Sequence, residues 1–305
     1  MNDAINVFDR ALVRRRRDRA AATLGGNGFL FQEAAERLAD RLEDVTRSFP
    51  VALDLGCRAG GLAATLGGRG GIERLVQCDL SPAMARAAAD NGRATLAADE
   101  EALPFARESF DLVMSALSLH WVNDLPGTLL QIRTVLKPDG LFLGAMLGGE
   151  TLKELRAALM DAEIAEEDGA SPRVSPFADV REAGGLLQRA GFALPVVDVD
   201  RITVTYPDAL SLMRELRAVG ESNAVLARRR VLARRATLAR AAVIYAERFA
   251  QEDGRLPATF EVIYLTAWAP HPAQQKPLSP GSATARLADA LGSEETPAGD
   301  KARPK

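Results

Sequence analysis

Short apolar runs recur along the first half of the chain and alternate with amphipathic stretches. Val51–Leu55 is the type of run expected for a strand buried in a parallel sheet. Later runs have the same character, and a helix fits between each pair. The pattern therefore predicts an α/β fold with a doubly wound, Rossmann-like sheet. The predicted strands are 51–55, 74–78, 94–97, 110–115 and 141–147, and the predicted helices are 7–23, 29–47, 61–66, one from Ser81, and 125–136.

The pattern changes after about residue 150, where helical segments predominate. Further helices are predicted at 151–167, 180–190, 208–218 and about 224–250, and edge strands at 196–206 and 260–268. Prolines accumulate from residue 270 and aromatic residues are absent there, which is typical of a disordered tail. We therefore expect an N-terminal helical segment over 1–48, a main domain over 49–269 with a helical lid or insertion at about 149–192 and 207–255, and a tail over 270–305.

Composition narrows the possible classes of protein. The chain has 305 residues, is 47% hydrophobic and carries a net charge of −3, which excludes a mostly disordered protein. We expect no transmembrane segment, since no uncharged apolar run reaches the roughly 18 residues that a membrane helix needs. A charge so near zero gives no general attraction for nucleic acid. The chain contains two cysteines and two histidines, and we expect neither disulfides nor a metal site.

A glycine-rich turn follows the first predicted strand, over 54–61. Gly56 and Gly60 permit positive φ and let the backbone approach a ligand at the carboxyl end of the sheet. Asp79 lies at the end of the second strand, 19 residues after Gly60, where a carboxylate accepts hydrogen bonds from ribose hydroxyls. The pattern indicates an adenosine-containing cofactor; the alternative is a tight turn with a surface aspartate.

Three further positions favour S-adenosylmethionine over a dinucleotide. Asp54 opens the turn and is placed for the ammonium group of the methionine. Asp99 follows the third strand, where the adenine amino group would lie, and Ser115 begins a segment, 115–121, that faces the reactive end. The middle glycine of a dinucleotide fingerprint is missing.

These motifs resemble those of class I S-adenosylmethionine-dependent methyltransferases over about residues 50–147. The resemblance implies that Cys57, Leu80 and Glu100, which stand inside the matching motifs, also contact the cofactor. Arg58 departs from the family pattern, which usually has a second glycine there. A bulky arginine either reshapes the loop and weakens binding or pairs with the cofactor carboxylate.

His120 and Trp121 follow the fourth strand, near the expected position of an acceptor. Histidine is suited to act as a general base near neutral pH, and we treat both residues as catalytic candidates. The alternative is a packed His–Trp pair that only lines the pocket. Two arginine-rich stretches, 14–17 and 228–240, are read as solvated helix faces, although the second would also fit an acidic partner or a membrane surface.

A closer resemblance covers about residues 5 to 268. Its motifs are Phe8-Asp-Arg10, Arg17-Asp-Arg-Ala-Ala21, Leu119-His-Trp-Val-Asn-Asp-Leu-Pro126, Gly144-Ala-Met-Leu-Gly-Gly-Glu-Thr-Leu-Lys-Glu-Leu-Arg156, Ser171-Pro-Arg-Val-Ser-Pro-Phe177, Gly220-Glu-Ser-Asn223 and Glu252-Asp-Gly-Arg-Leu-Pro-Ala-Thr259. Together they resemble the family of mitochondrial complex I assembly factor five and its bacterial relatives.

That resemblance implies an enzyme that modifies an arginine of the quinone-site iron–sulfur subunit of complex I. Hydroxylation is what the family implies and methylation is what the fold implies. The sequence offers no obvious facial triad for iron-dependent hydroxylation. The expected location is the cytoplasm of a bacterium, at the inner-membrane face, or the mitochondrial matrix of a eukaryote; a peripheral membrane association stays open.

Two alternatives remain. One is a methyltransferase for a small molecule or an acyl carrier protein, similar to the malonyl-carrier-protein methyltransferase of biotin synthesis. The other is a non-catalytic assembly chaperone that kept the scaffold after Arg58 altered the loop.

Overall fold

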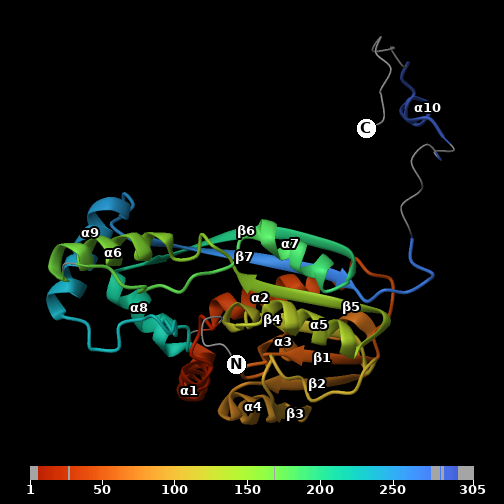
Figure 1. Cartoon of the computed structure of the whole chain (residues 1–305), viewed down its shortest axis with the longest axis horizontal. Helices are drawn as coiled ribbons and strands as arrows, with labels where there is room; N and C mark the ends of the chain where they lie inside the picture. The colour runs from red at the N-terminus through yellow and green to blue at the C-terminus, as the bar shows by residue number, and fades with distance from the viewer. Residues whose placement is uncertain (1–5, 27, 168, 276–281, 283–284, 295–305) are drawn as a thin grey trace. The chain divides into compact units, whose positions relative to one another are not determined.

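The chain divides into a main unit, 1–270, and a second unit, 271–305. The computed structural model describes residues 6–26, 28–167, 169–275, 282 and 285–294. A seven-stranded sheet organises the main unit, with strand order β3-β2-β1-β4-β5-β7-β6 (Figure 1). Strands from β3 to β5 run parallel, and β7 is antiparallel to both β5 and β6. The strands are β1 (Val51–Leu55), β2 (Arg74–Asp79), β3 (Ala94–Ala97), β4 (Phe110–Ala116), β5 (Leu136–Leu147), β6 (Ala193–Tyr206) and β7 (Leu256–Trp268). The predicted α/β class and doubly wound sheet are confirmed.

The central strands are apolar throughout because both faces of the sheet are covered. Side chains at alternate positions enter two separate cores. Ala52 and Leu112 contribute to the first core, whereas their neighbours Leu53 and Val113 contribute to the second. This double burial explains why continuous apolar runs, and not alternating ones, marked these strands in the sequence.

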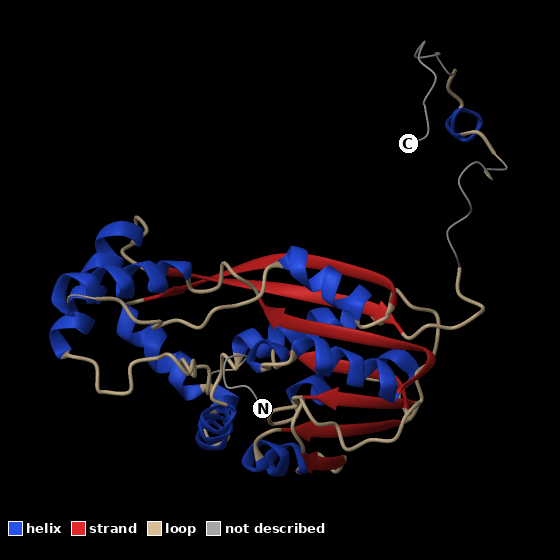
Figure 2. Cartoon of the chain, viewed as in Figure 1, coloured by secondary structure: helices blue, strands red, loops and turns tan. Residues whose placement is uncertain are grey.

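Helices cover the two faces (Figure 2). Residues of α2 and α3 pack in the first core, and residues of α5 and α7 pack in the second. Pro82 occupies the first turn of α4, and the Ser81 hydroxyl caps that helix by accepting the N–H of Met84 at 3.1 Å. These helices are α2 (Phe29–Asp40), α3 (Gly61–Thr65), α4 (Pro82–Ala89), α5 (Leu125–Val135) and α7 (Val180–Arg189), with short 3-10 turns η2 (Leu24–Gly26), η3 (Arg69–Gly71) and η4 (Leu119–Trp121).

A third core lies where β6 and β7 extend past the parallel strands. It joins α6 (Lys153–Glu167), α8 (Ala209–Ala218) and α9 (Arg235–Phe249), which gather at one end of the sheet in Figure 1. The chain leaves the sheet at Tyr206 and returns at Leu256, and these two residues pair directly across β6 and β7. The intervening segment therefore begins and ends at adjacent points of one hairpin.

The helix predicted over about 224–250 is wrong in its first part. It begins only at Arg235, and residues 221–234 run as turns and loop. Val225 forms an isolated bridge with Phe8, and the N–H of Leu226 donates to the carbonyl of Val7 at 2.8 Å. This pairing with the N-terminal segment holds the backbone extended where periodicity alone favours a helix.

The N-terminal segment carries α1 (Arg10–Ala20), whose Asp9 side chain caps it by accepting the N–H of Leu12. In the second unit, α10 (Leu287–Leu291) ends at Gly292. The predicted disorder of the tail falls largely on residues outside those described. Within the described ranges, no helix has the length and apolar character needed to cross a bilayer.

Candidate active site

The glycine turn after β1 is held against the end of β2 by backbone hydrogen bonds. The carbonyl of Cys78 accepts the N–H of Gly56 at 2.8 Å and that of Cys57 at 2.9 Å. Gly56 has φ +75°, and a Cβ there would collide with the Ser118 side chain. Gly60 has φ +83° and caps α3. Both glycines are thus required by conformation, as the sequence predicted.

A cavity of about 400 Å³ opens beside this turn. Its wall includes Asp54, Gly56, Cys57 and Arg58 from the turn, together with Phe31 of α2. Asp54 is completely buried, and neither carboxylate oxygen has a well-formed hydrogen bond within the described chain. Burial, and secondly the charge of Asp79, raise the pKa of Asp54 to about 7, which the nearby Gln77 amide only partly offsets. A buried, unsatisfied carboxylate at a cavity wall fits a ligand ammonium group.

The other positions of the candidate cofactor site lie at the ends of β2, β3 and β4. Asp79 is fully buried and accepts the backbone N–H of Arg58 at 3.0 Å and that of Ser81 at 2.7 Å. Asp99 is partly exposed and pairs with Arg10. Ser115, on β4, is buried, and its hydroxyl lacks a partner among the described residues.

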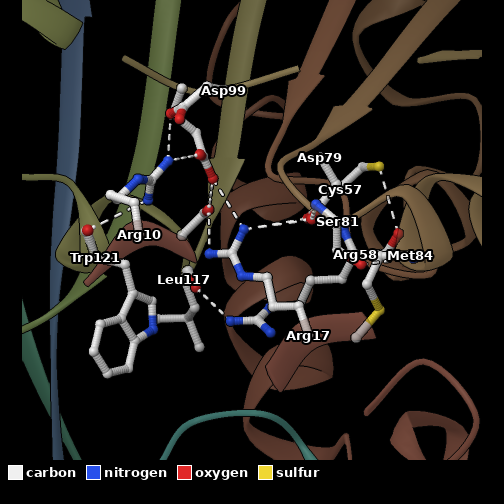
Figure 3. Close-up of polar contacts among 12 residues, drawn as sticks. Arg10, Arg17, Cys57, Arg58, Asp79, Ser81, Met84, Asp99, Leu117 and Trp121 are labelled. Carbon is white, nitrogen blue, oxygen red and sulfur yellow. Dashed lines mark hydrogen bonds and ion pairs between the residues drawn. The ribbon is translucent and has the colours of Figure 1, made fainter. Parts of the chain in front are cut away.

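Two arginines of α1 reach into this row of carboxylates (Figure 3). Arg17 is fully buried; its guanidinium lies 3.0 Å from Glu100 and 3.4 Å from Asp79, and donates to the Ser118 hydroxyl at 2.9 Å. Arg10 pairs with Asp99 and Glu100. Burial alone would raise the pKa of Glu100, but the charges of Arg17 and Arg10 lower it to about 2.

These contacts correct the interpretation of 14–17 as a solvated face. Arg14 and Arg15 are exposed, but Arg17 lies on the buried side of α1 with Val13 and Ala20. Their helical spacing could have revealed this in the sequence. The cavity wall includes Asp54 but not Asp79, Asp99 or Glu100. Helix α1 thus covers the half of the site in which adenosine was expected.

Arg58 has a backbone φ of +49°, so it adopts the conformation that a glycine usually provides. Its guanidinium stacks on the ring of Phe31, 3.9 Å from the centroid, and donates to the carbonyl of Leu117 at 2.9 Å. It also forms an ion pair with Glu221. The bulky side chain is therefore accommodated within the turn and is directed towards Glu221.

His120 and Trp121 lie together on η4, and both contact the same carboxylate. Glu221 Oε2 lies 3.0 Å from His120 Nε2 and accepts the indole N–H of Trp121 at 2.8 Å. Burial lowers the pKa of His120, against the opposing effect of Glu221, which leaves the imidazole neutral near pH 7. Burial would raise the pKa of Glu221, but the charge of Arg58 outweighs it and holds that pKa well below its usual range.

Leu80 has a packing role in the structure, against the small apolar cluster that contains Phe8 and Trp121. Cys57 is also buried, and burial raises the pKa of its thiol. The site residues that the sequence analysis did not select are Arg10, Arg17, Ser118 and Glu221.

Comparison with known proteins identifies the family. A family model described as "Methyltransferase domain" matches residues 53–144. The chain is 46% identical over 289 residues to "Arginine-hydroxylase NDUFAF5, mitochondrial" of Danio rerio, covering 93% of this chain and 89% of that protein. The chain belongs to the NDUFAF5 family. It is therefore an enzyme of methyltransferase fold, as the sequence motifs indicated.

Another protein similar to this chain is named for a different activity. The malonyl-[acyl-carrier protein] O-methyltransferase of Methylovorus sp. is 39% identical over 275 residues, covering 87% of this chain and 90% of that protein. Among solved structures, the YcgJ protein of Bacillus subtilis superimposes with a TM-score of 0.54 at 14% identity, over 77% of this chain and 98% of that chain. The last similarity concerns the fold alone.

Proposed function

We propose that this enzyme binds S-adenosylmethionine and modifies an arginine side chain of the quinone-site iron–sulfur subunit during assembly of respiratory complex I. The observation that carries the proposal is the 46% identity to a protein named arginine hydroxylase over nearly the full length of both chains. The similarity extends well beyond the methyltransferase model at 53–144 and so includes the region around Glu221.

The residues of the site fit the cofactor. Asp54 offers an unpaired, buried carboxylate for the ammonium group, and the turn from Gly56 to Gly60 offers close backbone approach to the methionine. Asp79 would hold the ribose hydroxyls, and Asp99 with Glu100 would contact the adenine, once Arg17 and Arg10 share or release these carboxylates. S-adenosylmethionine supplies an electrophilic methyl group when bound. Hydroxylation and methylation of the arginine both belong to the proposal.

If the iron–sulfur subunit is its substrate, the enzyme acts where complex I is assembled. That is the inner face of the cytoplasmic membrane in a bacterium or the matrix in a mitochondrion. Arg230 and Arg234 are exposed on the loop before α9, and Arg235 is exposed at the start of that helix, around an almost fully exposed Leu232. This surface supports a peripheral association with an anionic membrane during assembly.

The test is a mass comparison of arginine-containing peptides. The complex I iron–sulfur subunit is isolated from cells with and without the gene, and from cells that express an Asp79→Asn variant. We expect one peptide to lose the mass of an oxygen atom, or of a methylene group, in the deletion. Identical masses in all three strains would overturn the proposal, and calorimetry with S-adenosylmethionine would then decide between another acceptor and a chaperone without cofactor.

The similarity to malonyl-carrier-protein methyltransferases supports a second candidate, methyl transfer to a malonyl carboxylate. Purified enzyme is incubated with labelled cofactor and malonyl-loaded acyl carrier protein. Label on the carrier protein would favour this candidate, and its absence would count against it.

A further inference from the structure

Glu221 connects the cofactor turn to the two catalytic candidates. It lies just after α8, in the segment between β6 and β7, and is almost completely buried, with 8% of its side chain exposed. Oε1 pairs with the guanidinium of Arg58, and Oε2 contacts both His120 and Trp121. The carboxylate is therefore fixed from three directions, and each partner comes from a loop at the carboxyl ends of β1 and β4.

This arrangement determines which nitrogen of His120 carries the proton. Arg58 keeps Glu221 ionised, so Oε2 can only accept a hydrogen bond. A neutral His120 must then be protonated at Nε2. Its Nδ1 is consequently a lone-pair acceptor, and it is buried with no hydrogen-bond partner in the described part of the chain. The charged groups that act on the imidazole are Glu221, Arg58 and Arg17.

The His120 ring lies among aromatic side chains, next to the wall of a second cavity. The centroid of the His120 ring lies 5.5 Å from that of the Trp121 ring and 5.9 Å from that of the Phe177 ring. Phe177 and Glu221 also line an apolar cavity, enclosed mainly by leucine and phenylalanine side chains, that is distinct from the cavity at Asp54. The imidazole thus packs against Phe177, which lines this apolar cavity, and is joined through Glu221 to Arg58, which lines the cavity at Asp54.

We propose that Glu221 is a positioning residue that holds His120 in the Nε2–H form, so that Nδ1 takes a proton from the acceptor group. In this step the N–H bond of the acceptor breaks, its electron pair stays on the acceptor nitrogen, and an Nδ1–H bond forms. The resulting imidazolium is paired with Glu221. The inference rests on the proposed function and deepens it: the site is built for an acceptor that loses a proton as it is modified, such as a guanidinium, whereas a carboxylate at neutral pH has no proton to lose.

The first test reads the tautomer without any turnover. The chain has only two histidines, His120 and His271, and His271 is exposed, so ¹⁵N-histidine NMR of the full chain separates them. We expect His120 to be neutral and protonated at Nε2 near pH 7, with Nδ1 unprotonated, and we expect Glu221→Gln to weaken this preference. An Nδ1–H tautomer or an imidazolium in the wild type would overturn the inference.

The second test measures modification of an arginine peptide from the iron–sulfur subunit. Glu221→Gln should lower the rate at least about tenfold, since a positioned general base contributes roughly 10²–10⁴-fold, and Glu221→Asp should recover part of it. Glu163→Gln is the matched control, because Glu163 is also a buried carboxylate paired with an arginine, Arg173, but lies outside the site. Unchanged activity in Glu221→Gln would overturn the inference and leave the proposed function standing. Absence of modification by the wild type would overturn the proposed function, whereas the NMR result would still decide the tautomer.

Discussion

Nη1 of Arg17 lies 3.0 Å from Oε1 of Glu100, and neither side chain is exposed to solvent. The same nitrogen faces Asp79 at 3.4 Å, so one guanidinium compensates two buried carboxylates. Arg17 comes from α1, outside the predicted sheet domain. Its positive charge nevertheless compensates the carboxylates of Asp79 and Glu100, at the ends of β2 and β3. The stability of the sheet edge and the closure of the candidate cofactor site therefore depend on the same contact.

Arg17→Met should reduce the free energy of unfolding by about 3 kcal/mol, because it removes the arginine that pairs with buried Asp79 and leaves buried Glu100 with Arg10 alone. Urea denaturation measures this difference, and Arg14→Met, at an exposed position of the same helix, is the control. The pKa of Glu100 is lowered to about 2, so its contribution to stability is present above its ordinary pKa and is lost as the pH falls towards 2. The variant should lose this contribution at a higher pH. Equal stability of the two variants would show that the pair is neutral.

Gly56→Ala should destabilise the protein by at least about 2 kcal/mol, since it combines strained backbone with overpacking. The added methyl group would collide with Ser118, and φ is +75°. Gly61→Ala is a close control, because a Cβ at that position meets nothing within 4 Å and lies in the first turn of α3. Thermal unfolding of both variants checks the expectation, which fails if the two melt alike.

Asp54→Asn should separate stability from cofactor binding. The pKa of Asp54 is raised from 3.8 to about 7 in the folded protein, so folding favours the protonated form. The unfolded carboxyl ionises as the pH rises through its ordinary pKa while the folded one keeps its proton, and this group therefore costs stability increasingly up to about pH 7. The asparagine variant avoids that cost and should be more stable than the wild type above neutral pH.

The same substitution removes the charge proposed to hold the cofactor ammonium. We expect S-adenosylhomocysteine to bind at least about tenfold more weakly, since charge-assisted hydrogen bonds contribute roughly 1.5–3 kcal/mol. Calorimetry measures this, and the wild type should release protons on binding near pH 7 as Asp54 becomes ionised. Unchanged affinity in Asp54→Asn would show that the ammonium group is held elsewhere.

Most strands of the parallel core were predictable from sequence almost to the residue, whereas β5 begins at Leu136, five residues before the predicted start at 141. The runs 51–55 and 94–97 coincide with β1 and β3. For β1 the reason is that a strand buried on both faces is predominantly apolar, whereas β3 is an edge strand with exposed ends. The local hydrophobic pattern wrongly predicted a helix over 224–234, where pairing with Val7 and Phe8 decides the backbone conformation. Such long-range competition leaves no trace in a window of neighbouring residues.

The residues of the candidate site also fall into two groups, those predictable from local spacing and those that only the fold reveals. Asp54, Gly56, Gly60 and Asp79 were identifiable because a turn between strand and helix imposes a local spacing. Arg17 and Glu100 are 83 residues apart, and His120 and Glu221 are 101 residues apart. The sequence had singled out Glu100 and His120, but only the fold brings Arg17 and Glu221 to them, so these two partners follow from the structure.

The pairing of Tyr206 with Leu256 has an evolutionary consequence. Everything between them, including Glu221, departs from and rejoins the hairpin at adjacent rungs, so it can be lengthened, shortened or exchanged without changing the register of β6 and β7. Selection can then alter what the enzyme acts on, provided that the contacts of this segment with Arg58, His120 and Trp121 are kept.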